Sequence, residues 1–424
     1  MIQRLPNRDS SVAFFHPPGR LGRPDNPFGK DIANAALFRG LVEHGGFSRV
    51  GVLNQLGLKP EQLASELTPS LNAAAAVEFS TAPLWNTSLP SQCGTLLRGQ
   101  PYLEELAWLR RAAGLDRHYS LVGLIHTIAP PAIREKIGAA ALAPTHPWDA
   151  LICTSPAVQQ AMEAMFDGWA EHLAARLGAT RSPRPQLPLI PLAVDVPALQ
   201  QQRADQQARK VLRERLGIPD DEQLVLWVGR LSFFEKAFPQ AMFEAVARAS
   251  KISGQRLHFA LLGWFPGGDA DLKRYQQAAS LLAPGLKVSV LDGNDPQLLA
   301  QSWAAADVFL SLVDNIQETF GLAPVEAMAA GLPVVVSDWD GYRYTVRDGV
   351  DGFRIPTLIS AAGDPGERLA HHHSLELVTY QAYAGAVAQH TAVQQSTTRG
   401  GVAGRVCSAH PGSLGVCAPC TVVA

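Results

Sequence analysis

Apolar runs of strand length alternate with helix-length periodic segments along nearly the whole chain. This alternation is typical of βα units arranged around parallel sheets, so it predicts the α/β fold class. In the first half of the chain, the predicted strands are 11–16, 47–54, 119–126, 149–154 and 187–194. Helical periodicity predicts helices over 31–44, 103–113 and 157–177. Together these elements predict one Rossmann-like sheet.

A second series of elements follows the segment 197–222, which is rich in Gln, Arg and Asp and which we interpret as a connection outside the core. Its predicted strands are 223–228, 257–262, 287–291, 307–312, 333–337 and 352–355. Its predicted helices are 240–250, 272–282, 297–305 and 323–330. We therefore expect two Rossmann-like domains, 1–205 and 206–394, with an interdomain cleft at the carboxyl ends of both sheets, where ligands of open α/β sheets bind.

After residue 394 the chain lacks acidic residues and helical periodicity, and Gly, Ala, Ser, Val and Cys dominate it. We expect 395–424 to be an irregular, disordered tail, or the out-of-frame end of a gene whose product normally runs longer. The cysteines and histidine at 407, 410, 417 and 420 suggest zinc ligands. Their spacing lacks two paired knuckles, however, so no metal is predicted there.

Composition narrows the range of functions. The 36 Lys and Arg residues against 38 Asp and Glu residues leave a net charge of −2, so the chain has no general positive field for nucleic acid. The content of 47% hydrophobic and 17% charged residues is typical of a folded protein. No run approaches 18 apolar residues, and the polar start of the chain does not resemble a signal peptide. A cytoplasmic location is therefore expected.

The most informative segment is DNIQETFGLAPVEAMAAGLPVVVSDWDGYRYTVRDGVDGFR, residues 314–354. Seven residues separate Glu318 from Glu326, and ADVFLSL precedes the segment. Together these motifs resemble the donor-site signature of retaining nucleotide-sugar glycosyltransferases of the GT-B fold, the family 4 type of the group 1 glycosyl transferases. The resemblance extends over roughly 11–393 and is densest over 224–356.

The same segment suits a diphosphate on physical grounds. Backbone N–H groups around Phe320, Gly321 and Leu322 begin a predicted helix, where an anion is favoured. Gly321 lacks a side chain and allows close approach. Glu326 lies about one turn into the helix, where it would accept hydrogen bonds from ribose hydroxyls, or would simply be an acid favoured by the helix dipole.

The resemblance implies more about the reaction. A sugar would pass from a nucleotide diphosphate to an acceptor hydroxyl, with Glu326 at the ribose and Glu318 at the hydroxyls of the transferred sugar. Attack would come from the front face, and the leaving phosphate would take the acceptor proton. No cofactor, metal or protein nucleophile is implied. The acceptor would be a glycan, a lipid-linked sugar or a small molecule, and a lipid acceptor would bring the protein to a membrane surface.

Two cations follow the first strand of the second domain. Arg230 and Lys236 lie in VGRLSFFEKAFP, where they would neutralise the charge of a departing diphosphate. This segment resembles the family's GRL…EK segment, whose Arg and Lys contact the phosphates, although the loop here is slightly longer and more aromatic. The alternative for such a pair after a strand is a solvated loop.

In the first domain the resemblance points to Gly29 and His126. Gly29 lies in NPFGKDIANAALFRG, where many family members have two adjacent glycines in the corresponding loop. His126, in GLIHTI, matches the family histidine that reaches the donor sugar near its 6-position. A purely structural histidine at a strand end is the alternative.

Other functions are weighed against this one. The D-x-D pairs at 269/271 and 338/340 are a metal motif of a different transferase fold, and we interpret them as chance occurrences. A glycosidase would also use two carboxylates, but the phosphate-ready surroundings of Glu318 argue against it. The remaining alternatives are a donor-binding but inactive GT-B-like protein, truncated or frame-shifted, and a nucleotide-sugar epimerase.

Overall fold

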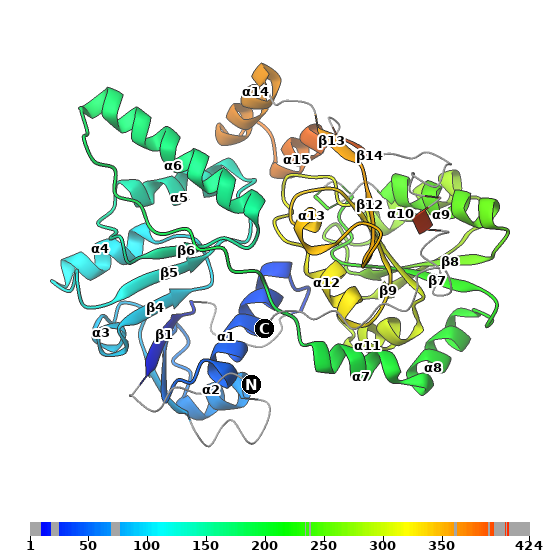
Figure 1. Cartoon of the computed structure of the whole chain (residues 1–424), viewed down its shortest axis with the longest axis horizontal. Coiled ribbons are helices and arrows are strands. Elements are labelled where there is room, and N and C mark those ends of the chain that lie inside the picture. Colours follow the sequence, from blue (N-terminus) through cyan, green and yellow to red (C-terminus); the bar gives the residue numbers. More distant parts are fainter. Residues whose placement is uncertain are drawn as a thin grey trace. The chain divides into compact units, whose positions relative to one another are not determined.

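The chain forms two compact units, Met1–Ala193 and Val194–Ala424. Each contains a six-stranded parallel sheet with helices on both faces, as Figure 1 shows. Two Rossmann-like α/β domains were expected, and this is confirmed, with the division lying ahead of the expected boundary at 205/206. The computed structural model describes residues 10–17, 25–68, 77–233, 235–236, 239–359, 363–388, 391–393, 403 and 405–406.

The sheet of the first unit has the strand order β3-β2-β1-β4-β5-β6. Its strands are β1 (Ser11–Phe15), β2 (Arg49–Leu53), β3 (Glu78–Ala82), β4 (Thr95–Arg98), β5 (Ser120–Leu124) and β6 (Ala150–Ile152). Alternate residues of a strand face opposite sides, so Val12 and Phe14 pack with one layer of helices and Ala13 with the other.

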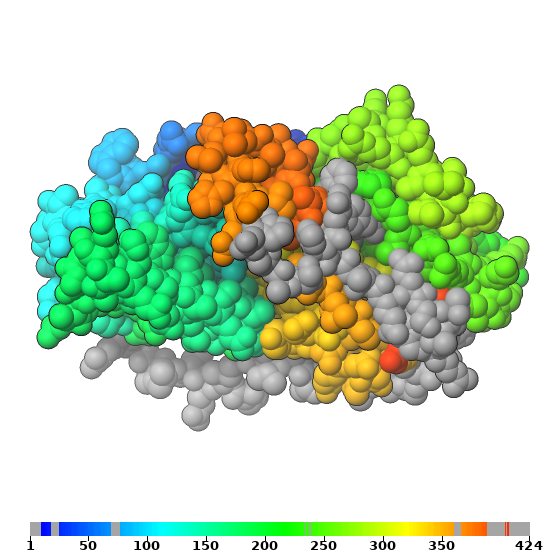
Figure 2. Space-filling model, turned by 90° about the horizontal axis from the view of Figure 1, so that it is seen from above, coloured from blue at the N-terminus to red at the C-terminus, as the bar shows by residue number. Residues whose placement is uncertain are grey.

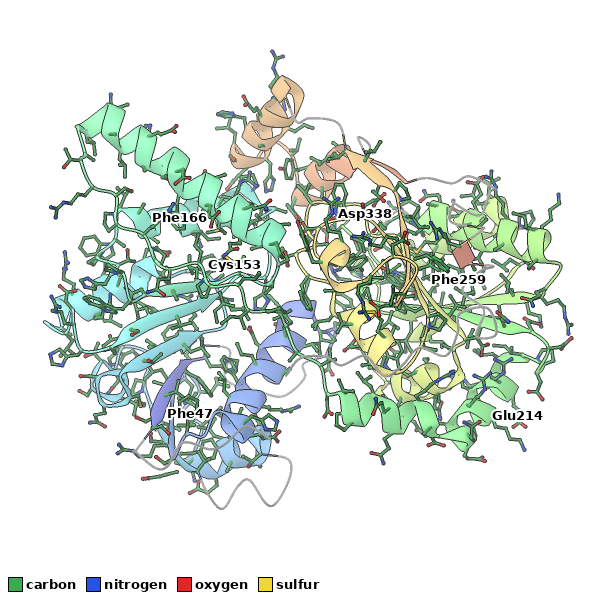
Figure 3. The ribbon with its side chains drawn as sticks, in the orientation of Figure 1. Phe47, Cys153, Phe166, Glu214, Phe259 and Asp338 are labelled. Carbon is green, nitrogen blue, oxygen red and sulfur yellow. The ribbon has the colours of Figure 1, made fainter. Side chains whose placement is uncertain are left out.

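Helices cover both faces of this sheet. The layer that packs on Val12 and Phe14 contains α1 (Gly29–His44) and α2 (Pro60–Leu67). The opposite layer contains α4 (Glu104–Ala112), α5 (Pro131–Gly138), the short 3-10 helix η1 (Ala139–Ala141) and α6 (Pro156–Leu177). A short helix, α3 (Ser88–Cys93), contacts β1 and β2. Phe166 of α6, labelled in Figure 3, is 2% exposed and anchors that helix to the core.

The sheet of the second unit has the order β12-β11-β10-β7-β8-β9. Its strands are β7 (Gln223–Val228), β8 (Leu257–Gly263), β9 (Lys287–Asp292), β10 (Val308–Ser311), β11 (Val334–Ser337) and β12 (Gly352–Ile355). Leu224 and Leu226 of β7 face one helix layer, and Val225 and Trp227 face the other. Because both of their faces are covered, the strands β7, β10 and β11 are largely apolar runs in the sequence.

The first of these layers contains α7 (Val196–Ala204), α8 (Gln206–Leu216), α11 (Pro296–Ala305) and α12 (Leu322–Ala329). The second contains α9 (Pro239–Ser253) and α10 (Asp269–Leu282), and α10 presents its outer side to solvent, in yellow-green in Figure 2. Further elements are α13 (Tyr342–Thr345), α14 (Gly363–Ser374), α15 (Tyr380–Ala388) and an antiparallel pair, β13 (Thr357–Ile359) and β14 (Thr391–Val393). Among the described helices, none is long and apolar enough to cross a membrane.

The segment 197–222 is part of the core, so its interpretation as a connection was wrong. It forms α7 and α8, which bury Leu199 and Leu212 in the second unit. Three arginines of these helices donate hydrogen bonds to carbonyl oxygens at the C-terminal end of α11: Arg203 to Ala304 (2.8 Å), Arg209 to Ala305 (2.8 Å) and Arg213 to Ala305 (3.4 Å). These carbonyls lack intrahelical partners, which explains why cations bind them.

The predicted strand 187–194 is also wrong. This segment makes only isolated bridges with the β6 region, at Gln186 and Leu189. Pro188 has no N–H group to donate, so the ladder is interrupted there, although its carbonyl oxygen and the Ile190 N–H still bond to Cys153. The sheet instead contains β3 and β4, which the pattern did not predict.

Part of the expected tail is corrected too. Ala403 and Val406 are 1% and 4% exposed and belong to the core of the second unit. The Arg405 guanidinium lies over the ring of Phe353, 4.7 Å from its centre, and 3.8 Å from Asp348. At these positions the chain is therefore packed rather than disordered. The cysteines and histidine considered as zinc ligands lie outside the described residues.

Candidate functional site

The sheet of the second unit changes direction between two neighbouring strands. From β7 the chain proceeds through β8 to β9 on one side, and from β10 it proceeds through β11 to β12 on the other. Loops that leave such a switch point diverge, and ligands of open α/β sheets bind there. The loop after β7 carries Arg230 and Lys236, and the loop after β10 carries Glu318. The topology thus places three predicted site residues at one switch point.

Lys236 and Glu318 are in direct contact. Lys236 Nζ lies 3.1 Å from Glu318 Oε2, and their side chains are 27% and 11% exposed. Glu318 Oε1 accepts hydrogen bonds from the backbone N–H groups of Thr319 (3.2 Å) and Phe320 (3.4 Å). Burial acts to raise the pKa of Glu318, but the charge of Lys236 and these hydrogen bonds outweigh it and hold the pKa below its ordinary value. Glu318 is therefore a largely buried anion.

Arg230 is held inside the same loop. Its guanidinium pairs with Glu235, and both residues are buried. The backbone N–H of Glu235 donates to Ser232 Oγ at 3.2 Å, which fixes the loop. Glu235 was not among the predicted residues. The signal was present, because an acid directly before Lys236 can reach back to an arginine at the strand end.

The N-terminus of α12 borders the Glu318 loop. Gly321 caps the helix with φ +87°, and a Cβ there would lie 1.9 Å from Tyr342 Cε1, so only glycine fits. Tyr342 is fixed by the contact of its hydroxyl with Ser311 Oγ at 2.9 Å. Leu322 begins the helix, and N–H groups of a first turn lack intrahelical partners. An anion can bind there.

Two further predicted residues lie beside this helix start. Phe320 is 4% exposed, so its ring belongs to the core. Its backbone N–H was expected to be available to an anion, but it donates to Glu318 instead. Glu326 lies in the second turn of α12 and is partly exposed. The predicted residues Lys236, Glu318 and Phe320 therefore form one hydrogen-bonded group, with Glu326 on the adjoining helix.

The loop after β11 contributes a residue that the sequence did not single out. Asp340 lies in this loop, which Asp338 marks in Figure 3. Burial and the charge of Glu318 raise the pKa of Asp340 to about 7. The D-x-D pattern had been interpreted as chance. A better indication that Asp340 belongs to the site is its position directly after β11, an apolar strand that neighbours β10.

The remaining predicted residues belong to the first unit. His126 Nε2 lies 2.9 Å from Asn34 Oδ1 and 3.0 Å from the carbonyl oxygen of Gly99, so this nitrogen carries the hydrogen. Burial lowers the pKa of His126 to about 4, and the charge of Lys30 adds to this, whereas the Gly99 carbonyl opposes it. His126 is therefore neutral at pH 7. Gly29 begins α1 in an exposed position, and a Cβ there would meet no atom within 4 Å.

The D-x-D pairs lie beside arginines. Asp271 accepts a hydrogen bond from the Gly267 N–H at 2.8 Å and lies 3.4 Å from Arg274. Asp338 lies 3.3 Å from Arg354. Over the described part of the chain, no group of three or more His, Cys, Asp or Glu residues is placed to hold a metal ion.

Comparison with known proteins gives a family match over part of the chain. Residues 208–362 match the family model of the glycosyl transferases group 1. The matched region includes all six strands of the second sheet and the loops with Arg230, Lys236 and Glu318.

Curated relatives agree with this match. The D-inositol 3-phosphate glycosyltransferase of Corynebacterium efficiens is 33% identical over 144 residues, which are 34% of this chain and 33% of that protein. The enzyme of the same name from Geodermatophilus obscurus is 35% identical over 151 residues, 34% of this chain and 32% of that protein. The match thus spans about a third of the length of these relatives.

Solved structures extend the similarity to both units. HepE of Anabaena, in complex with UDP, superposes with a TM-score of 0.54 at 19% identity over 90% of this chain and 95% of that chain. Sucrose-phosphate synthase of Thermosynechococcus elongatus gives a TM-score of 0.51 at 18% identity over 95% of both chains. The chain therefore has the GT-B fold of two Rossmann-like domains, as expected.

Proposed function

We propose that this protein is a retaining glycosyltransferase that moves a sugar from a nucleotide diphosphate to the hydroxyl of an acceptor. The observation that carries the proposal is the 3.1 Å contact between Lys236 and Glu318 at the switch point, beside the N-terminus of α12. A cation and a helix start suit a diphosphate, and a carboxylate suits sugar hydroxyls. The family match over 208–362 and the names of the relatives support this assignment.

Each residue has a proposed role. Lys236, Arg230 and the first N–H groups of α12 stabilise the negative charge that develops on the leaving diphosphate. Glu318 accepts hydrogen bonds from hydroxyls of the transferred sugar, and Glu326 accepts them from the ribose. The roles of Gly29 and His126 toward the donor rest on the family resemblance and stay predictions.

The proposed chemistry needs no protein nucleophile. The bond between the anomeric carbon and the phosphate oxygen breaks while the acceptor oxygen attacks the same face of the sugar. Because the new bond forms on the face that the phosphate leaves, the configuration is retained, and the acceptor proton passes to the leaving phosphate oxygen. Because Lys236, Arg230 and the helix N-terminus supply positive charge, we propose that the reaction needs no metal ion, and turnover in excess EDTA tests this.

Calorimetric titration tests the nucleotide site. The full chain is titrated with UDP, GDP and ADP in the presence of EDTA, and UDP comes first because HepE is described in complex with UDP. We expect selective binding of one nucleotide that is weakened in Glu326→Ala. The matched control is Glu214→Ala, which removes a glutamate that is 66% exposed on α8. If the folded chain binds none of the three nucleotides, the proposal is refuted.

A second experiment tests the reaction. The nucleotide sugar of the selected base is incubated with the chain, and proton NMR follows the anomeric configuration of the first sugar released to water. Retention of the donor configuration is expected, with loss of turnover in Glu318→Gln and no change in Glu214→Gln. Inversion would refute the retaining mechanism. If the chain binds donors but shows no turnover with several donor sugars and several acceptors, the alternative of an inactive GT-B-like protein is favoured.

A further inference from the structure

Asp340 lies at the same sheet edge as Glu318. It follows β11, which neighbours β10, so the loops after these two strands leave the sheet side by side. A Cβ on Gly341 would lie 2.3 Å from the Cα of Phe320, so the two loops are in direct backbone contact. Asp340 itself has φ +39°, a conformation that residues with a side chain rarely adopt. The loop is thus held in a strained form against the Glu318 loop.

The carboxylate of Asp340 lacks a hydrogen-bond donor at one oxygen. Its Oδ1 is fully buried, and among the residues that the structure describes it has no hydrogen-bond partner. The groups that act on the Asp340 carboxylate are Glu318, which repels its negative charge, Arg343, which attracts it, and the backbone N–H of Gly341, which donates a hydrogen bond to it. Buried polar atoms are nearly always paired, so an exception points to a missing ligand. Strained backbone conformations also cluster at functional sites.

The chemistry of the missing ligand follows from its surroundings. A phosphate group would bring negative charge toward both Asp340 and Glu318, and the Lys236 ammonium lies on Glu318 rather than on Asp340. A neutral group with several O–H donors would satisfy both carboxylates without adding charge. A sugar ring has this character, whereas the nucleotide diphosphate does not.

We propose that Asp340 Oδ1 accepts a hydrogen bond from a hydroxyl of the transferred sugar and so helps Glu318 to select the donor sugar. This inference rests on the proposed function. It assigns to the sugar subsite a residue that sits outside the Glu318–Glu326 motif, on a different strand end.

The test compares binding of the sugar part of the donor with binding of the nucleotide part. Dissociation constants are measured by calorimetry, without acceptor, for the nucleoside diphosphate that the wild type binds and for its glucose conjugate. In Asp340→Ala we expect binding of the conjugate to weaken about ten-fold to a hundred-fold, the range for a hydrogen bond to a charged group, while binding of the diphosphate is unchanged. The control is Glu214→Ala, which removes a glutamate that is 66% exposed on α8 and should change neither constant.

The outcomes distinguish this inference from the proposed function. Equal weakening of both ligands in Asp340→Ala, or no change in either, would overturn the role of Asp340. Absence of nucleotide binding in the wild type would instead refute the proposed function. Folding is checked by circular dichroism. If the alanine variant is unfolded, Asp340→Gly, which removes the carboxylate and suits the positive φ, is judged by the same selective loss for the conjugate.

Discussion

Replacing Asp149 with alanine is expected to destabilise the first unit strongly. Asp149 forms a two-pronged pair with Arg110, with both N–O distances at 2.8 Å and both side chains 0% exposed. It also accepts hydrogen bonds at 2.8 Å from the backbone N–H groups of Leu121 and His146. The substitution therefore leaves a buried cation and two backbone donors without their acceptor.

The size of the destabilisation follows from the burial of the Arg110–Asp149 pair. Removing one partner of a buried ion pair costs about 3–5 kcal/mol, because the other charge stays uncompensated. That is a large fraction of the roughly 5–15 kcal/mol by which domains are stable. The control is Asp167→Ala, which breaks a pair with Arg184 at a similar distance, 2.7 Å, but with side chains 65% and 45% exposed. Exposed pairs contribute about 0–1 kcal/mol, so this variant should be nearly as stable as the wild type.

Hydrogen exchange followed by mass spectrometry reads the two units separately in the full chain. In Asp149→Ala, peptides covering β5 and β6 should exchange about a hundred-fold to a thousand-fold faster, since each 1.4 kcal/mol of opening free energy is a factor of ten. Peptides covering β8 in the second unit should keep their protection. If Asp149→Ala costs no more than Asp167→Ala, burial does not govern this pair and the reasoning fails.

Three further predictions concern single residues of the candidate site. Gly321→Ala places a methyl group 1.9 Å from Tyr342 Cε1 at φ +87°, so it should lower the melting temperature and abolish nucleotide binding; unchanged values would contradict the fitted turn. Because burial lowers the pKa of His126 from 6.5 to about 4, the unfolded chain takes up this proton first, and stability should fall as the pH drops through that window. Urea unfolding at pH 7 and pH 5 should show a smaller loss in His126→Gln. Because burial and Glu318 raise the pKa of Asp340 from 3.8 to about 7, wild-type stability should fall as the pH rises through that window. Asp340→Asn should therefore gain about 2–4 kcal/mol relative to the wild type between pH 4 and pH 8, and a constant difference would contradict the raised pKa.

The six strands of the second sheet could be predicted, whereas α7 and α8 were taken for a connection. The strands β7, β10 and β11 are covered on both faces, so they are largely apolar runs between helical segments. The runs at β7 and β12 match the predicted strands at both ends. Helix starts are marked locally as well: Asp295 caps α11 by accepting a hydrogen bond from the Gln297 N–H at 2.8 Å, and Pro296 follows it.

The first unit was harder because some of its central elements are short and polar. The strand β4 is only TLLR, yet it pairs with both β1 and β5. It ends in Arg98, whose guanidinium stacks 5.0 Å from the ring centre of Phe15 and donates to the carbonyl oxygen of Tyr102 at 2.9 Å. A buried arginine of this kind depends on tertiary partners that no local pattern reveals.

The residues of the candidate site also differ in whether a local sequence pattern locates them. The glutamate spacing and the cations after β7 were visible in the sequence, because they sit at strand and helix ends that the apolar pattern locates. Glu235 and Asp340 were missed, since their importance arises from contacts with Arg230 and from nearness to Glu318. The roles of all these residues stay predictions until the variants are measured.

The arginines of α7 and α8 have a consequence for the order in which the second unit forms. Arg203, Arg209 and Arg213 bind carbonyl groups of α11 that lie 92 to 101 residues later in the chain. At synthesis rates of roughly 5–20 residues per second, the acceptor carbonyl groups are synthesised about 5–20 s after the arginines that bind them. The contacts that join these two helices to α11 are therefore expected to form late in the folding of the unit.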